Sequence, residues 1–321
     1  MSSNNNKSKL ILSILVIILI LVIGFFVQFN NNISNLYENI GIDNSKLNIL
    51  FLDVGQGDCT LITINGHTML IDAGNDSDGY YITQFLKSQD IHRIDYLIGT
   101  HIDEDHIGGL DEVIEEFEIE NLYIPQNIRT NEKIYKNIEE AVYNKDGLKI
   151  NEKEQGYTFN LGDAECKILS DKDKDIDVKN ANETSIIIQM SYGNKKYLFM
   201  GDATERIEKT IEFEKIDVLK VGHHASNSST SQKFLEQIVP IYSIISVGNS
   251  NSYNLPNDNV LQRLQAIGTK IYRTDKDGTI WIKSDGDTIK IKTLNINLDG
   301  ANRKVSIVKN YNNTLYYCLG T

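Results

Sequence analysis

Short apolar runs bounded by Gly, Asn or Asp recur along the chain after residue 46, and they constrain its fold more than any other feature. Such runs predict strands because they are rich in β-branched and aromatic residues and too short for helices. Asn65-Gly66 joins two of them, as in a tight hairpin. Strands are predicted at 47–54, 59–64, 68–73, 94–100, 121–125, 166–170, 185–193, 195–201, 217–222, 242–248, 270–274, 279–284 and within 288–298.

Helical spacing of apolar residues appears in five segments between these strands, at 80–89, 110–119, 205–213, 232–239 and 257–267. Two blocks of strands, each accompanied by helices, predict a mixed, sheet-rich α/β layered domain rather than a uniform βαβ array. A dinucleotide-binding fold is excluded because Gly55-Gln56-Gly57 lacks a third glycine and precedes a strand.

Potential metal ligands are concentrated directly after the strand at 94–100. The sequence there reads THIDEDHIGG, so His101, Asp103, Asp105 and His106 lie within six positions. A loop at the end of a strand can turn imidazoles and carboxylates toward one point. Borderline cations such as zinc, manganese or iron accept this mixed set of donors.

Three more candidate ligand sites follow or end other apolar runs: Asp72 in LIDAG, Asp202 in MGDA, and the pair His223-His224 after DVLKVG. A single Asp at such a position is usually a turn former, and paired histidines are often surface residues. The recurrence of the same pattern at four strand ends favours a shared metal site instead. We interpret His67 and His92 as structural.

The N-terminal region contains one long apolar block, residues 10–27 (LILSILVIILILVIGFFV). A helix of that length covers roughly 27 Å, close to the thickness of a bilayer core. A core helix would have a polar face, and this block has none. A cleaved signal peptide would have a small-residue cleavage site, and none follows the block. We therefore predict an uncleaved signal anchor. Lys7 and Lys9 precede the block, which places 1–9 in the cytoplasm and the remainder outside the cell. The Asn-rich residues 28–45 are predicted to form a tether.

The chain is acidic, with 32 Lys and Arg against 44 Asp and Glu, for a formal net charge of −12. An acidic chain cannot attract nucleic acid through its overall field, so only a local basic groove or bound metal would hold a polyanion. Lys220 and Lys233 are the cations nearest in sequence to the second histidine pair, and residues 111–120 carry six carboxylates. Three widely spaced cysteines do not indicate a disulfide framework, although one pair could bond outside the cell.

The motifs FLDVGQGDCTLI, LIDAG, THIDEDHIGGL, MGDA and LKVGHHAS occur in the order found in metallo-β-lactamase-fold hydrolases, and the chain resembles most the extracellular hydrolase-like domain of ComEC competence proteins. The run SVGNSNSYNLPNDNVLQRL and the later YRTDKDGTI are also similar to that domain. The resemblance covers about 48–284. It implies an αββα sandwich with two divalent metal ions, zinc or manganese, at one edge of its two sheets.

By this resemblance, His101 and Asp103 serve the first metal, Asp105 and His106 the second, and Asp202 bridges them. His223 is a further ligand, His224 moves protons or holds substrate, and Asp105 counts as catalytic as well as ligating. Asp72 does not bind the metals itself but orients the ligating imidazoles of the first cluster. Residues that face the substrate or shape loops are expected among Asp53, Asp58, Lys220, Ser226, Asn251 and Tyr253.

The sequence departs from the family pattern at three positions. Asp103 replaces a common histidine, as in ComEC-like proteins, which makes the ligand set harder and favours manganese. Ala225 stands where HHGS has glycine. Leu255 stands where the motif NxYxHP has histidine, and leucine can neither ligate metal nor transfer a proton.

The resulting expectation is a membrane-anchored, metal-dependent hydrolase that activates water, acting first on phosphodiesters, with nucleic acid as one such substrate. A small ester, lactone or lactam is the alternative substrate, and a degenerate metal-binding module without turnover is the alternative class. The predicted organisation is a cytoplasmic N-terminus at 1–9, an anchor at 10–27, a tether at 28–45, a hydrolase domain at 46–290 and a C-terminal β extension at 291–321. The sequence does not identify a protein partner.

Overall fold

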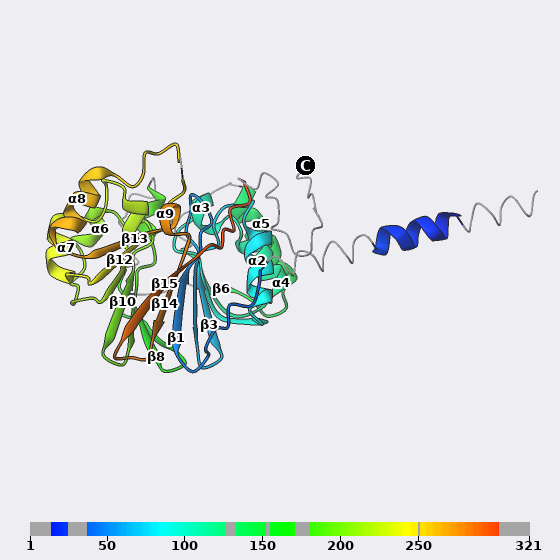
Figure 1. Ribbon diagram of the computed structural model, residues 1–321, viewed down its shortest axis with the longest axis horizontal. Coiled ribbons are helices and arrows are strands. Elements are labelled where there is room, and N and C mark those ends of the chain that lie inside the picture. The colour runs from blue at the N-terminus through cyan, green and yellow to red at the C-terminus, as the bar shows by residue number, and fades with distance from the viewer. Residues whose placement is uncertain are drawn as a thin grey trace, which may run out of the picture.

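The computed structural model describes residues 14–24, 37–125, 133–151, 155–170, 180–249 and 251–301. Two β-sheets face each other and helices cover their outer faces (Figure 1). This is the predicted layered α/β arrangement.

The first sheet has eight strands in the order β15-β14-β1-β2-β3-β4-β5-β6. Its strands are β1 (Leu47–Phe51), β2 (Thr60–Ile64), β3 (His67–Ile71), β4 (Arg93–Ile98), β5 (Glu118–Tyr123), β6 (Ile150–Asn151), β14 (Thr279–Ser284) and β15 (Ile289–Leu294). The β2–β3 hairpin turns at Asn65-Gly66, where both residues have positive φ, as predicted.

The second sheet has seven strands in the order β13-β12-β11-β10-β9-β8-β7. Its strands are β7 (Thr158–Leu161), β8 (Ala164–Ile168), β9 (Ile188–Tyr192), β10 (Lys195–Phe199), β11 (Val218–Lys220), β12 (Tyr242–Ile245) and β13 (Lys270–Arg273). Strands β10 to β13 are parallel, as are β3 to β6 in the first sheet.

Helices on the outer face of the first sheet are α2 (Gly79–Ser88), α4 (Leu110–Glu116) and α5 (Lys133–Asn144). In α2, the buried residues Ile82, Phe85 and Leu86 follow helical spacing and pack against the sheet. The second sheet is covered by α6 (Glu205–Glu208), α7 (Gln232–Ile238) and α8 (Asp258–Ala266). The hydroxyl of Ser231 caps α7 by accepting from the Phe234 amide. Short elements complete the fold: α3 (Glu104–Ile107), α9 (Thr274–Asp277), η1 (Ala181–Thr184) and η2 (Gly222–Ala225).

Three hydrophobic layers result: one between the sheets, and one beneath each set of helices. The sequence prediction located every strand named above except β6 and β7, and it missed α5. The helix predicted at 205–213 ends at Glu208. The carboxylate of Glu208 is buried and accepts from the Thr230 and Ser231 amides, so this segment is shaped by tertiary contacts.

The N-terminal apolar block lies partly outside the described residues, since 10–13 and 25–27 are not included. Residues 14–24 form an exposed helix. Within the described part of the chain, no helix has both the length and the apolar character needed to cross a membrane. The predicted tether is described only from residue 37, and the predicted C-terminal extension only as far as 301, including part of β15.

Candidate metal centre

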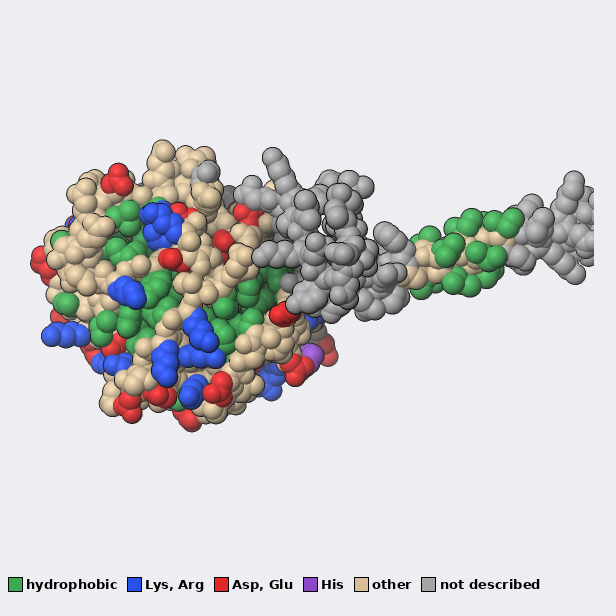
Figure 2. All heavy atoms as spheres, in the orientation of Figure 1, with side chains coloured by type: hydrophobic (Ala, Val, Ile, Leu, Met, Phe, Trp, Pro, Cys, Tyr) green, Lys and Arg blue, Asp and Glu red, His purple; other side chains and the backbone are tan. Residues whose placement is uncertain are grey.

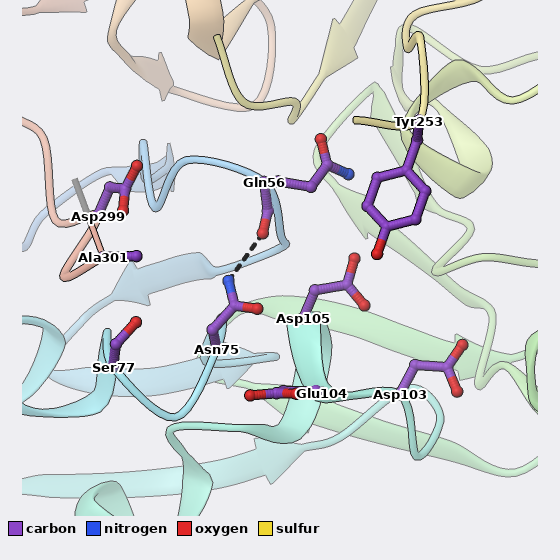
Figure 3. A pocket seen from close by; sticks show the side chains of 9 residues that line it. All are labelled: Gln56, Asn75, Ser77, Asp103, Glu104, Asp105, Tyr253, Asp299 and Ala301. Atoms are coloured by element: carbon purple, nitrogen blue, oxygen red, sulfur yellow. Dashed lines mark hydrogen bonds between the residues drawn. The ribbon is translucent and has the colours of Figure 1, made fainter. Parts of the chain in front are cut away.

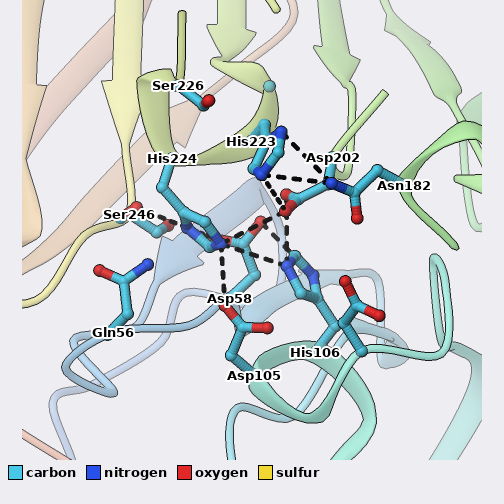
Figure 4. A network of polar contacts seen from close by, with 12 residues as sticks. Gln56, Asp58, Asp105, His106, Asn182, Asp202, His223, His224, Ser226 and Ser246 are labelled. Carbon is cyan, nitrogen blue, oxygen red and sulfur yellow. Dashed lines mark hydrogen bonds and ion pairs between the residues drawn. The ribbon is translucent and has the colours of Figure 1, made fainter. Parts of the chain in front are cut away.

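The candidate ligands meet at one edge of the sandwich, where parallel strands end. Asp72 follows β3 and His101 follows β4 in the first sheet, while Asp202 follows β10 and His224 follows β11 in the second. Because the carboxyl ends of parallel strands point the same way, loops from both sheets converge there. Residues that are far apart in sequence therefore share one site, as Figure 4 shows.

Asp72 holds the loop that carries the densest ligand cluster. Its carboxylate accepts from the backbone N–H of Thr100 at 2.7 Å and from the Thr100 hydroxyl at 2.8 Å. Its Oδ2 also lies 2.8 Å from Nδ1 of His106. This arrangement suits the orienting role predicted for Asp72.

Two glycine positions allow the loops to approach closely. A Cβ at Gly57, which has a φ of 154°, would lie 2.6 Å from the carbonyl oxygen of Asp105, to which the Asp58 amide donates. A Cβ at Gly109 would lie 2.5 Å from the carbonyl oxygen of Ala73. The DVGQGD and GG motifs are thus explained by packing around the ligands.

Hydrogen bonds fix the tautomers of three histidines. The Thr100 hydroxyl donates to Asp72, so at 3.1 Å it accepts from Nδ1 of His101. Nδ1 of His106 donates to Asp72, and Nδ1 of His224 donates to the carbonyl oxygen of Ser246 at 3.0 Å. In the neutral form each imidazole then presents an unprotonated Nε2, the atom that binds metal.

These three Nε2 atoms point into one buried volume beside Asp202. The Nε2 atoms of His106 and His224 are 3.2 Å apart, and Oδ1 of Asp202 is 3.2 Å from the first of them. Nε2 of His101 and Oδ1 of Asp202 are buried without a hydrogen-bond partner. Lone pairs that face one another, and buried acceptor atoms without a partner, are costly unless a cation lies between them. The set of ligand atoms therefore fits divalent metal ions.

The donors form two overlapping groups. His101, His106 and Asp202 offer ligand atoms within 4.8 Å of one another, and so do Asp105, His106 and His224. Oδ2 of Asp202 lies 3.9 Å from His101 Nε2 and 3.6 Å from His224 Nε2. Asp103, about half exposed, reaches within 3.4 Å of His101 Nε2. Asp202 is therefore central, where its predicted bridging role requires it to be.

The two adjacent histidines occupy different environments from those predicted. His224 is buried, with Nε2 3.2 Å from Asp105. His223 lies at the rim, 3.7 Å from Asp202, and contacts the Asn182 amide and the Ser228 hydroxyl. The geometry favours His224 as the ligand and His223 as the residue nearer the solvent, the reverse of the predicted roles.

Carboxylates dominate the electrostatics of the cluster. Burial lowers the pKa of His224, but Asp202 and Asp58 outweigh it and raise that pKa to about 10. Burial raises the pKa of Asp202, but His106 and His224 outweigh it and hold that pKa well below its usual value. Protons and metal ions therefore compete for the same atoms, and acid should release metal.

Lys220 and Asp58, expected among the residues that face the substrate or shape loops, lie inside the protein and not in the described lining of the cleft. Both are buried, and Nζ of Lys220 lies 2.6 Å from Oδ2 of Asp58. The other oxygen of Asp58 is 3.4 Å from Nδ1 of His224. The pair therefore lies behind the ligand cluster.

A cleft of about 560 Å³ opens next to the cluster, which is the size of a small-ligand site (Figure 3). Its lining shares Asp103 and Asp105 with the ligand cluster, and Tyr253 directs its hydroxyl toward them. Among the residues that the structure describes, the lining consists of Gln56, Asn75, Ser77, Asp103, Glu104, Asp105, Tyr253, Asp299 and Ala301. These described residues include carboxylates but no Lys or Arg.

Three other residues predicted to face the substrate or shape loops are absent from this lining. Asp53 is buried and accepts from the Gly55 amide and the Asn297 side chain, so it shapes its loop. Asn251 accepts from the Tyr253 and Leu255 amides, which fixes the loop that carries Tyr253. Ser226 lies beside Ser228 and away from the cluster (Figure 4).

Sequence reasoning missed several residues of the site. Asn182 and Ser246 contact the two histidines, yet neither belongs to a ligand-like motif, and Ser246 acts through its backbone. At the cleft wall, the backbone carbonyl oxygen of Gln56 accepts a hydrogen bond from the side-chain amide of Asn75 (Figure 3). Gln56 lies inside the recognised GQG run, which was its only signal.

Comparison with known proteins gives a consistent assignment. The family model described as Metallo-beta-lactamase superfamily matches residues 52–248. Over 200 residues the chain is 34% identical to ComE operon protein 3 of Bacillus subtilis (strain 168), covering 61% of this chain and 25% of that protein. Over 248 residues it is 29% identical to Recombination protein 2 of Haemophilus influenzae, covering 75% and 29%.

The matched region thus spans less than a third of either relative. Among solved structures, a mutant of the β-hydroxylase CmlA matches with a TM-score of 0.50 and 13% identity, covering 76% of this chain and 55% of that one. Identity that low supports the fold alone.

Proposed function

The chain belongs to the metallo-beta-lactamase superfamily and is a metal-dependent hydrolase, and from this premise we propose that it cleaves phosphodiester bonds at the cleft beside its ligand cluster. The observation that carries the proposal is the convergence of the Nε2 atoms of His101, His106 and His224 on the carboxylate of Asp202. Such a donor set is suited to divalent ions, and divalent ions suit a substrate with negative oxygens.

Two ions would be held as follows: His101, Asp103 and Asp202 would bind the first, while Asp105, His106, His224 and Asp202 would bind the second. When bound, such ions lower the pKa of water toward neutrality and neutralise charge that develops at the attacked centre. Three carboxylates in the set favour manganese as well as zinc.

The protein's own groups would position the substrate and move protons. Tyr253 carries a hydroxyl above the metal ligands Asp103 and Asp105, where it would donate to a substrate oxygen. His223, at the rim with Ser228, would hold or deliver a proton to the leaving group. Asp72 and the Ser246 carbonyl would keep His106 and His224 in the tautomers that ligate metal.

Phosphodiester bonds are the first choice because the relatives are named as competence and recombination proteins. The acidic helix region at 110–120 does not oppose this choice directly. None of its residues lines the cleft, and Glu116 and Glu120 pair with Lys87 and Arg93.

A small neutral ester, lactone or lactam is the second candidate. The observation in its favour is that the described part of the cleft lining contains no Lys or Arg to hold a polyanion. A neutral substrate would need only the metals and the polar groups Gln56, Asn75 and Tyr253.

We further propose that residues 10–27 anchor the protein in the membrane as a single span, with the hydrolase domain outside the cell. The apolar composition of that block and the preceding Lys7 and Lys9 support this arrangement. Protease treatment of intact cells or spheroplasts tests it: digestion of the domain is expected, and protection until lysis would contradict the orientation.

Activity assays on the full-length protein in detergent test the catalytic proposal. With manganese or zinc, we expect hydrolysis of the chromogenic diester bis(4-nitrophenyl) phosphate, loss of activity in chelator, and recovery when metal returns. His224→Ala should lower kcat/KM by more than about 100-fold, whereas His92→Ala, at an exposed histidine, should not change it. Hydrolysis of an ester, lactone or lactam panel without hydrolysis of diesters would favour the second candidate.

A further inference from the structure

Four lysines cluster on the outer face of the first sheet, at the β14–β15 edge. We call Lys46, Lys283, Lys290 and Lys292 the lysine face. In the antiparallel β14–β15 pair, Lys283 lies opposite Lys290 and Trp281 opposite Lys292. Ile280 and Ile282 point between the sheets, so Trp281 and Lys283, which alternate with them, lie on the outer side. Figure 2 shows blue side chains gathered on the face where Figure 1 places these strands.

The four lysines of the lysine face form no direct ion pair with any described carboxylate. Like charges directly opposite on neighbouring strands destabilise a sheet. Within the described residues no carboxylate lies within ion-pair distance of any of the four, whereas Lys87, Lys196 and Lys209 each pair with a glutamate. Nζ of Lys283 instead sits 3.7 Å from the centre of the Trp281 ring. In a chain with a net charge of −12, such a cluster is not expected by chance.

Acidic neighbours offset this charge only at longer range than an ion pair. Asp43 interacts with Lys283 and Lys46 at longer range, but its carboxylate is engaged by the Ser45 amide and hydroxyl. Asp285 accepts from the Thr288 amide and hydroxyl. Burial, together with Lys292 and Lys46, lowers the pKa of Lys283, and Asp43 offsets part of this effect.

The chain leads from the lysine face to the cleft through β15. That strand runs from Lys290 past Lys292 toward Leu294, and the chain then reaches Asp299 and Ala301 in the cleft lining. Lys292 and Asp299 are seven residues apart, so at most about 25 Å separates them. Among the described residues, the cleft supplies metal ligands without cationic side chains, and the lysine face supplies cationic side chains without metal ligands.

We infer that the lysine face docks the phosphate backbone of a single-stranded nucleic acid whose scissile phosphodiester enters the cleft. This inference rests on the proposed phosphodiesterase function and names its substrate class. A strand rather than a duplex is chosen because the cleft has the volume of a small-ligand site. Lysines that neutralise phosphates release counterions, so binding should weaken steeply with salt.

Fluorescence anisotropy with a labelled 20-nucleotide oligothymidylate tests the inference. The full-length protein in detergent is used with chelator present, so that binding is measured without cleavage. The variant Lys283→Gln/Lys290→Gln/Lys292→Gln is compared with Lys149→Gln/Lys215→Gln/Lys233→Gln, which removes three exposed lysines elsewhere. Lys290→Gln/Lys292→Gln, which keeps the Lys283–Trp281 contact, guards against an effect of misfolding.

We expect the lysine-face variant to bind at least about tenfold more weakly and its salt slope to fall by about 2, while the distant variant matches the wild type. The two-lysine variant should lie between them. Equal binding by wild-type and lysine-face proteins would overturn the inference, as would equal losses in both triple variants. Binding to vesicles of phosphatidylglycerol is measured for the same proteins. If the lysine-face variant lost vesicle binding but kept oligothymidylate binding, the inference would also be overturned, because the occupant would then be a lipid surface.

Hydrolysis of bis(4-nitrophenyl) phosphate separates this inference from the proposed function. That small diester has no backbone to dock, so the lysine-face variant should cleave it at the wild-type rate. Failure of all proteins to cleave it would count against the proposed function, while a selective loss of oligothymidylate binding would still support the docking surface.

Discussion

Nζ of Lys220 lies 2.6 Å from Oδ2 of Asp58, and this buried ion pair lies directly behind the imidazole of His224. Burial alone would raise the pKa of Asp58, but Lys220 and His224 outweigh it and hold that pKa well below its usual value. The pair also joins the two sheets, because Asp58 lies in the loop between β1 and β2 of the first sheet and Lys220 ends β11 of the second.

Breaking this pair should destabilise the protein strongly. Lys220→Met leaves a buried carboxylate without its cation, so the free energy of unfolding should fall by about 3 kcal/mol or more in urea denaturation. Asp58→Asn/Lys220→Met removes both charges and should recover part of that loss. Lys233→Met, at an exposed lysine, serves as the control. A Lys220→Met protein within about 1 kcal/mol of the wild type would contradict this account.

Asp53 should make stability fall as pH rises through the weakly acidic range. Burial raises its pKa to about 6, against an ordinary value of 3.8 for an aspartate. The folded protein then holds the proton more tightly, so this stabilisation is complete below about pH 4 and lost as pH passes 6. Asp53→Asn should therefore be more stable than the wild type by roughly 1 kcal/mol at pH 8 and equal to it at pH 4.

Urea denaturation at both pH values measures this difference. Asp285 provides a case of opposite sign, because hydrogen bonds from Thr288 lower its pKa to about 2. Asp285→Asn should lose stability at pH 8 rather than gain it. An Asp53→Asn variant with the same stability difference at pH 4 and pH 8 would show that protonation of Asp53 is not involved.

Ala225 is strained where the related motif has glycine. His223, His224 and Ala225 all have positive φ, and that of Ala225 is 63°. An alanine in this left-handed region is disfavoured by roughly 1 kcal/mol or more relative to glycine. Glycine also has the larger conformational entropy in the unfolded chain, which offsets part of the strain relieved by the substitution. Ala225→Gly should therefore stabilise the protein by roughly 0.5 kcal/mol.

Thermal or urea denaturation checks this gain. Ala266→Gly, in helix α8, is the matched control and should destabilise instead, because glycine is unfavourable in a helix. Loss of stability in both variants would contradict the strain at Ala225.

Leu255 packs away from the metal ligands, which changes the meaning of the departure from NxYxHP. Its side chain joins the apolar layer beneath α7 and α8, and its amide donates to Asn251. Leu255→His should therefore leave the metal dissociation constant unchanged in calorimetry and lower stability by about 1 kcal/mol. Metal binding tightened by about tenfold, with Leu255→Met unchanged, would show that the missing histidine belongs to the site.

The sequence identified the strands and ligand motifs because both are local. Each apolar run ends in its own polar cluster, and parallel strands bring those ends together, so His101, His106 and Asp202 could be assigned to one site from the recurrence of this pattern at strand ends. The missed elements are β6 with two residues and β7 with four, which lack distinct apolar runs, and α5, whose apolar spacing was not recognised.

The details that sequence could not supply depend on tertiary contacts. The environments of His223 and His224 are set by η2, whose left-handed turn directs one imidazole inward and the other toward the rim. The burial of Lys220 follows from its partner Asp58, which is 162 residues away. No local pattern contains either fact.

Metal stoichiometry of the Asp202 variant tests the central claim most directly. Elemental analysis of full-length protein equilibrated with manganese or zinc should find two equivalents in the wild type and in Asp90→Ala, at an exposed aspartate. It should find loss of metal in Asp202→Ala, because Asp202 belongs to the first donor group and its Oδ2 lies 3.6 Å from Nε2 of His224 in the second. Diester hydrolysis should disappear with the metal. If Asp202→Ala retained both equivalents, or if the wild type hydrolysed diesters equally well in chelator, the account of this site would be wrong.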